Sequence, residues 1–116
     1  MKMHTRTALA ALALSLAAAP AAAQESGAYI VRLGRDTVVV EQFTRTADRI
    51  EGTMVGHTPR TSIRTYTANL RPDGGISRLE MVTRIPTQPE LLPQTVTVTM
   101  GADSAQWRTQ RGDTVR

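Results

Sequence analysis

The sequence predicts an all-β protein, an antiparallel meander sheet with one apolar face that is open or half-barrel-like, preceded by a helical signal peptide. Three observations carry this prediction. Short runs in which Val, Thr and Ile alternate with polar residues recur after Gly27, as in half-buried strands. Clusters of Gly, Pro, Asp and Asn separate these runs. No stretch after Gly27 keeps a helical period of apolar residues.

The start of the chain has the three parts of a secretory signal peptide. A basic segment, MKMHTR, precedes the apolar run TALAALALSLAAAP, and the small residues Ala21–Ala23 suit signal peptidase. The apolar run of about 14 residues is shorter than the roughly 20 that a spanning helix needs. We therefore predict cleavage after Ala23, a periplasmic or secreted protein, and no transmembrane segment once residues 1–23 are removed.

Residues 24–116 are expected to form a single β-sheet module. The chain has no cysteine, so neither a disulfide nor a lipid-modified cysteine can hold it. Removing Lys2 and Arg6 from the 14 basic residues leaves 12 arginines against 10 acidic residues. These arginines are scattered singly among acids, whereas a nucleic-acid interface gathers them on one face, so nucleic-acid binding is not expected.

Turn residues place the strands and their registers. Strands are predicted at 28–33, 36–45, 49–57, 62–71, 76–84, 95–101 and 104–110. Their turns are Gly34-Arg35, with a positive φ at the glycine, Thr46–Asp48, Pro72–Gly75 and Ala102-Asp103. The directly opposed pairs that these turns imply are Val31–Val38, Tyr29–Val40, Val40–Met54, Thr44–Ile50, Tyr66–Met81, Ala68–Leu79, Thr67–Glu80, Asn69–Arg78, Met100–Ala105, Val98–Trp107 and Thr97–Arg108.

These registers sort the side chains onto two faces of the sheet. The apolar face is expected to carry Tyr29, Val31, Leu33, Val38, Val40, Ile50, Met54, Tyr66, Ala68, Leu70, Leu79, Met81, Val96, Val98, Met100 and Trp107. The polar face is expected to carry arginine, threonine and glutamate residues, Glu41 and Glu51 among them, interrupted by Ile30, Val39, Phe43 and Val55. The proline-spaced stretch Ile85–Gln94 is expected to cross to a new position or to an edge.

A sheet with one apolar face must pack that face against something. Each large side chain left in water forfeits roughly 1.5 to 3 kcal/mol. The sequence predicts no helix after Gly27 that could serve as a lid. The cover is therefore expected to be closure of the sheet on itself, an apolar ligand, a protein partner, or a domain downstream of Arg116.

Two stretches, GAYIVRLGRDTVVVEQFTRTADRIEGTMV and PRTSIRTYTANLRPDGGISRLEM, carry recurring strand and turn motifs. They are the Gly-x-Asp-Thr strand start at 34–37, the Glu-x-Phe-x-Arg-Thr segment at 41–46 and the Tyr-x-x-x-Leu strand at 66–70. With these motifs, about residues 27–84 resemble the amino-terminal β-rich module of longer, uncharacterised secreted bacterial proteins. That family has no established activity, so the resemblance implies the fold and further chain after Arg116.

The sequence predicts no catalytic residue, no metal ligand and no cofactor. After the signal peptide it holds one histidine, His57, and neither a GxSxG elbow, an HExxH pair nor a cysteine nucleophile. Tyr29, Tyr66 and Trp107 all fall on the predicted apolar face, so they either pack in a core or line a site for an apolar ligand. These three residues are the candidate ligand-binding residues.

The closing RGDTV repeats the pattern of LGRDTV at the first turn. We therefore expect Gly112-Asp113 to form a hairpin turn followed by a further strand, instead of an adhesion motif. The function that the sequence favours is a non-catalytic exported module that packs on a partner domain or binds an apolar ligand through its apolar face. The alternative is the amino-terminal fragment of a larger exported enzyme whose catalytic residues lie beyond Arg116.

Overall fold

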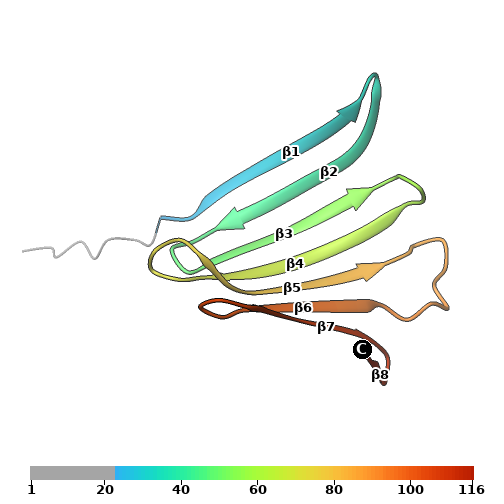
Figure 1. Ribbon diagram of the computed structural model, residues 1–116. Helices are drawn as coiled ribbons and strands as arrows, with labels where there is room; N and C mark the ends of the chain where they lie inside the picture. Colours follow the sequence, from blue (N-terminus) through green and yellow to red (C-terminus); the bar gives the residue numbers. More distant parts are fainter. Residues whose placement is uncertain (1–22) are drawn as a thin grey trace, which may run out of the picture.

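The computed structural model describes residues 23–116, which form one open antiparallel sheet (Figure 1). Its eight strands lie in chain order, each paired with the next. They are β1 (Glu25–Leu33), β2 (Asp36–Arg45), β3 (Arg49–Gly56), β4 (Ser62–Leu70), β5 (Ile76–Arg84), β6 (Gln94–Met100), β7 (Ala105–Arg111) and β8 (Thr114–Val115). The predicted all-β meander is confirmed, and β1 and β8 are the two edges of an open sheet.

Of the predicted signal peptide, residues 1–23, the first 22 residues lie outside the described part of the chain. Within residues 23–116, no helix has the length and apolar character needed to cross a membrane.

The β1–β2 hairpin has the predicted turn, followed by a bulge that the sequence did not reveal. Gly34 has a φ of 64°, which suits the first position of a two-residue hairpin turn. Val38 is an extra residue in β2, because Val31 lies opposite Val39 instead of Val38. The Val38 carbonyl accepts a hydrogen bond from the backbone amide of His57 at 3.0 Å, so the bulge is tied to the end of β3.

The bulge shifts the rest of β2 by one residue relative to the prediction. Tyr29 lies opposite Glu41, so the predicted pair Tyr29–Val40 is wrong. Since successive residues of a strand point to opposite faces, Val39, Glu41 and Phe43 share the face of Tyr29, and Val40 lies on the other face. A single bulged residue thus accounts for every side chain of β2 that the prediction placed wrongly.

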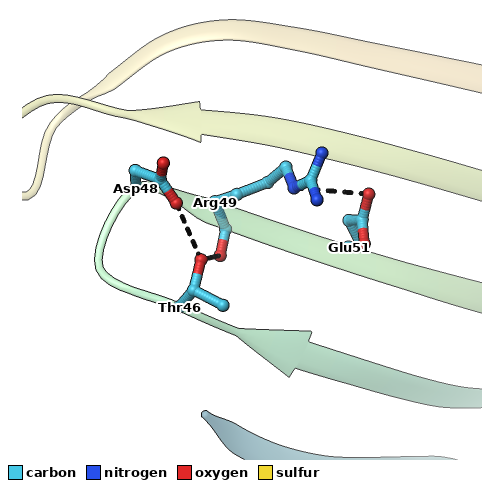
Figure 2. A network of polar contacts seen from close by, with 4 residues as sticks. All are labelled: Thr46, Asp48, Arg49 and Glu51. Atoms are coloured by element: carbon cyan, nitrogen blue, oxygen red, sulfur yellow. Dashed lines mark hydrogen bonds and ion pairs between the residues drawn. The ribbon is translucent and has the colours of Figure 1, made fainter. Parts of the chain in front are cut away.

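The β2–β3 turn, whose polar contacts Figure 2 shows, is one residue longer than predicted. Thr46 Oγ1 lies 2.9 Å from Asp48 Oδ1 and 3.3 Å from the Arg49 carbonyl oxygen, so its one proton is donated to the nearer Asp48 or shared between the two acceptors. The Thr46 amide donates to the same carbonyl at 2.8 Å, and Arg49 pairs with Glu51 at 3.4 Å. The predicted pairs Val40–Met54 and Thr44–Ile50 are therefore wrong; the observed pairs are Val40–Val55, Thr44–Glu51 and Arg45–Ile50.

The central and carboxy-terminal registers are confirmed. The pairs Tyr66–Met81, Thr67–Glu80, Ala68–Leu79 and Asn69–Arg78 hold in β4–β5, and Thr97–Arg108, Val98–Trp107 and Met100–Ala105 hold in β6–β7. The stretch between β5 and β6 was expected to cross to a new position, and this is wrong because β6 pairs directly with β5. The turn predicted at Gly112 is also confirmed: its φ is 56°, and Arg111 lies opposite Thr114 at the start of β8.

The registers define two faces, called face A and face B from here on. Face A carries Tyr29, Val31, Val39, Glu41, Phe43, Ile50, Met54, Arg64, Tyr66, Ala68, Leu79, Met81, Val96, Val98, Met100, Trp107 and Arg111. Face B carries Arg32, Glu51, Thr53, Thr65, Thr67, Arg78, Glu80, Thr95, Thr97, Thr99 and Arg108, with one aliphatic row made of Ile30, Val40, Val55 and Ile63.

Very little of the sheet is buried. Within residues 23–116 the buried residues are Ala68, at 4% exposure, and Ser62, at 8%. Both lie in β4, and both project from face A, Ser62 opposite Gly56 and Ala68 between Ile50 and Leu79. Face A is thus the side on which a core begins to form, although the described residues supply no second layer to complete it.

Candidate functional site

Four side chains from β1, β2 and β4 gather on face A. They are Tyr29, Glu41, Phe43 and Tyr66, and we call them the aromatic cluster. The rings of Tyr29 and Phe43 stack with their centroids 5.4 Å apart and their planes 12° from parallel. Such offset stacking adds roughly 0.5 to 1.5 kcal/mol to the burial of the two rings. This stacking links β1 and β2 on face A.

Two glycines make room for the rings of the aromatic cluster. A Cβ atom at Gly27 would lie 2.5 Å from Cζ of Phe43, and one at Gly52 would lie 2.5 Å from Cζ of Tyr66. Each glycine sits directly opposite the aromatic residue that covers it. A ring that lies flat over a cross-strand glycine shields the exposed backbone, which is how aromatic residues compensate for glycine in sheets.

A hydrogen bond closes the aromatic cluster. The hydroxyl of Tyr66 donates to Oε1 of Glu41, which comes from β2. Burial, this hydrogen bond and the negative charge of Glu41 together raise the pKa of Tyr66 from 10.0 to about 12. The phenol therefore stays protonated at neutral pH and serves as a hydrogen-bond donor, not as a base.

Trp107 lies on the same face but outside the aromatic cluster. It is in β7, opposite Val98, and the residue is 73% exposed. Its Nε1 donates a hydrogen bond to Thr109 Oγ1 at 2.9 Å. The structure therefore brings Tyr29 and Tyr66 together. It places Trp107 in β7, three strands from β4, the nearest strand of the aromatic cluster.

The sequence interpretation missed Phe43 and Glu41, which it placed on the polar face. The run Thr37-Val38-Val39-Val40 gives no sign of which valine is bulged, because each can occupy either face. The pairing of Gly27 and Gly52 with aromatic residues was the signal that could have found the shift. A glycine inside a strand favours a large ring opposite it, which selects the observed register.

The aromatic cluster borders a small hollow on face A, and face B has a larger one. The first, about 270 Å³, also touches Ile50 and Arg45. The second, about 710 Å³, spans β1 to β4 and has mostly hydroxyl-bearing side chains on its face B floor, namely Ser26, Thr44, Thr53, Thr65 and Thr67. Face A therefore offers apolar and aromatic contact, whereas face B offers a shallow surface of short hydroxyl-bearing side chains.

Among residues 23–116, no group of three or more His, Asp or Glu side chains could hold a metal ion. His57 lies in the β3–β4 loop, where its Nδ1 is 3.2 Å from Thr61 Oγ1.

No family model, curated protein or solved structure matches the chain. The resemblance to the amino-terminal module of secreted bacterial proteins stays a prediction.

Proposed function

We propose that the chain is a non-catalytic, exported β-sheet module whose face A packs against a second polypeptide layer. The observation that carries the proposal is the exposure of large apolar side chains on a face that already buries Ala68. Trp107 is 73% exposed, Tyr29 59% and Val31 50%. The covering layer is either a partner protein or a further part of the same polypeptide.

The free energy of burying apolar side chains favours a layer that covers face A. Fully burying one large apolar side chain contributes roughly 1.5 to 3 kcal/mol, and a stable domain has only about 5 to 15 kcal/mol of net stability. Completing the burial of several partly exposed side chains of face A therefore contributes a sizeable part of the stability of a small domain. A sheet with one apolar face ordinarily gains this energy from a second layer.

The shape and polarity of face A favour a protein over a small molecule as its main cover. The exposed side chains extend from Tyr29 in the edge strand β1 to Trp107 in β7, so they span nearly the whole sheet. Glu41 and Arg45 also project from face A among the apolar residues. A second protein layer can offer partners to these charges while it covers the apolar side chains.

A small apolar ligand is a second candidate, and the hollow of about 270 Å³ beside Tyr29, Phe43, Ile50 and Tyr66 favours it. The rings there are already seated by Gly27 and Gly52, so a ligand would meet a preformed surface. It would occupy one end of face A and would leave Trp107 uncovered. Fluorescence of a bound apolar dye, compared between the native chain and Tyr29→Ala, tests this candidate.

Photocrosslinking from two neighbouring residues of β7 tests the main proposal. A photoreactive amino acid replaces Trp107 on face A in one variant and Gln106 on face B in the other, and both are irradiated in the producing cells. We expect Trp107 to give one dominant crosslink and Gln106 to give none. Peptide mapping then identifies the cover as the same chain or another. Equal crosslinking from both positions would contradict the proposal.

The enzyme alternative depends on residues beyond Arg116. Reading the coding sequence past that codon tests it directly, because a His, Asp or Ser constellation in the continued frame would favour it and a stop codon would not.

A further inference from the structure

A walled cavity of about 240 Å³ lies at the end of face A, away from the aromatic cluster. Its floor is a cross-strand row in which Arg64, Thr83, Gln94 and Arg111 lie directly opposite one another in turn across β4, β5, β6 and β7. Its walls are two loops, one before β4 that contains Arg60 and one between β5 and β6. The floor and the walls therefore come from distant parts of the sequence.

The loop between β5 and β6 is structured and packs on the sheet. The amide of Gln88 donates to the carbonyl of Ile85 at 3.0 Å, and the amide of Leu91 donates to the carbonyl of Gln88 at 3.0 Å. Leu92 packs against Gly112, since a Cβ atom there would lie 2.8 Å from Leu92 Cδ1. Two successive turns and this contact hold the wall of the cavity in place.

Three arginines line this cavity, and we call them the arginine triad: Arg60, Arg64 and Arg111. Arg60 Nη1 donates to Gln88 Oε1 at 3.0 Å, which links the two wall loops. Arg111 Nη2 donates to Gln94 Oε1 at 3.1 Å. A neutral amide oxygen positions a guanidinium group but leaves its positive charge uncompensated. The remaining N–H donors of these two guanidinium groups are available to a ligand.

No carboxylate neutralises the arginine triad within the described residues. The side chains that line the cavity include neither Asp nor Glu. The ion pairs found in residues 23–116 are Arg49 with Glu51 and Arg78 with Glu80, and both lie on face B. Like charges close together raise the energy of the free protein, so a site with three unpaired cations favours an anion.

We propose that the cavity at the arginine triad binds a small oxyanion, either orthophosphate or the phosphate group of a small phosphomonoester. Planar guanidinium groups match the oxygens of a phosphate with paired, charge-assisted hydrogen bonds. The Thr83 and Gln94 side chains on the floor add polar partners. A volume of about 240 Å³ is below the roughly 300 to 1,000 Å³ of sites for drug-sized ligands, which fits one phosphate group.

This inference does not depend on the proposed cover of face A. The cavity has its own walls, and phosphate should bind the chain alone. Failure of the crosslinking experiment would leave phosphate binding intact, and failure of phosphate binding would leave the crosslinking result intact.

Isothermal titration calorimetry of the purified chain with orthophosphate, at constant ionic strength, tests the site. Arg64→Gln and Arg111→Gln are the test variants. Arg84→Gln is the matched control, because it removes the same charge from the neighbour of Thr83 but projects from face B, opposite Ile63. We expect saturable binding that each test variant weakens about tenfold, as loss of one charge-assisted hydrogen bond predicts. The control should change the affinity by less than about twofold.

Chemical shifts give a readout that needs no variant. Adding phosphate to the labelled native chain should shift the amide signals of Thr83, Gln94 and Arg111, and leave those of the aromatic cluster unchanged. A parallel titration with glycerol 3-phosphate distinguishes the sources: binding as tight as that of orthophosphate indicates a phosphomonoester, and weaker binding indicates the free ion. Absence of saturable phosphate binding, or equal weakening by Arg84→Gln and Arg64→Gln, would overturn the proposal.

Discussion

Face A and face B belong to the same strands, yet they differ in burial and in the residue types that they carry. Both buried residues of the described chain lie on face A, where Ala68 sits between Ile50 and Leu79. Face B is a surface of threonines and ion pairs, such as Arg78 with Glu80 at 2.9 Å, with one short aliphatic row. Face B is therefore mainly polar, although Ile30 is 58% exposed on it, whereas face A has the composition of the inner side of a layer, as the proposed cover requires.

A charge at the centre of face A should produce the largest difference in stability between substitutions on the two faces. Ala68→Asp places a carboxylate at a position that is 4% exposed, between two apolar neighbours, and should destabilise the chain by about 3 kcal/mol. Asn69→Asp, the next residue but on face B, is the control and should change stability by less than about 0.5 kcal/mol. Urea denaturation followed by circular dichroism measures both; similar losses would mean that the faces do not differ.

Crowding the aromatic cluster should have the next largest effect. Gly52→Ala forces a methyl group against the ring of Tyr66, and we expect a loss of about 1 to 3 kcal/mol. Gly56→Ala is the matched control in the same strand and on the same face, because its Cβ atom meets nothing closer than 3.7 Å. It should be neutral or slightly stabilising. In a Tyr66→Ala background, the cost of Gly52→Ala should disappear, and its persistence would contradict the seating of the ring on Gly52.

Removing the hydroxyl of Tyr66 should have a smaller effect that depends on pH. Tyr66→Phe loses the hydrogen bond to Glu41 and should cost about 1 kcal/mol at neutral pH. Because folding raises the pKa of Tyr66 from 10.0 to about 12, the hydroxyl stabilises the fold fully below pH 10. This stabilisation is lost as the pH rises through about 12.

Thermal melts of the native chain and Tyr66→Phe, at pH 8 and above pH 10, measure the difference. The gap in melting temperature should narrow at the higher pH. Glu41→Gln, which keeps a hydrogen-bond acceptor but removes the charge, should lower the pKa of Tyr66 in an absorbance titration. An unchanged titration in Glu41→Gln would mean that Glu41 does not set this pKa.

Breaking an ion pair on face B should have the smallest effect. The guanidinium of Arg78 and the carboxylate of Glu80 are both about half exposed, so their attraction is screened by water. Arg78→Gln should cost no more than about 0.5 kcal/mol. If urea denaturation showed a loss of several kcal/mol in the free energy of unfolding, this ion pair on face B would contribute to stability as strongly as packing on face A.

The sequence was sufficient where turn residues determine the geometry. Gly34 and Gly112 both occupy the left-handed position of a two-residue turn, and the registers of β4–β5 and β6–β7 followed from their loops. It was insufficient at Val38, because three consecutive valines fit either register. The packing of the Phe43 ring over Gly27 selects the observed one. A bulge is decided by packing across strands, which alternation along one strand does not contain.

The aromatic cluster and the arginine triad were predictable to different degrees. Tyr29 and Tyr66 were expected on one face because each lies in a clear alternating run. Arg60, Arg64 and Arg111 come together only because β4 to β7 are neighbours and the loop between β5 and β6 folds beside them. That loop was predicted to cross elsewhere, so the sequence could not indicate a shared cavity.

Thiol labelling of two adjacent residues in β6 tests most directly whether face A is covered. The chain has no cysteine, so Val98→Cys on face A and Thr97→Cys on face B each introduce a single reactive group. Both residues have intermediate exposure in the structure, and both variants should react with a maleimide in the purified chain. In the producing cells, we predict that Val98→Cys becomes protected while Thr97→Cys stays reactive. Equal reactivity of Val98→Cys in cells and in the purified chain would contradict a covered face A.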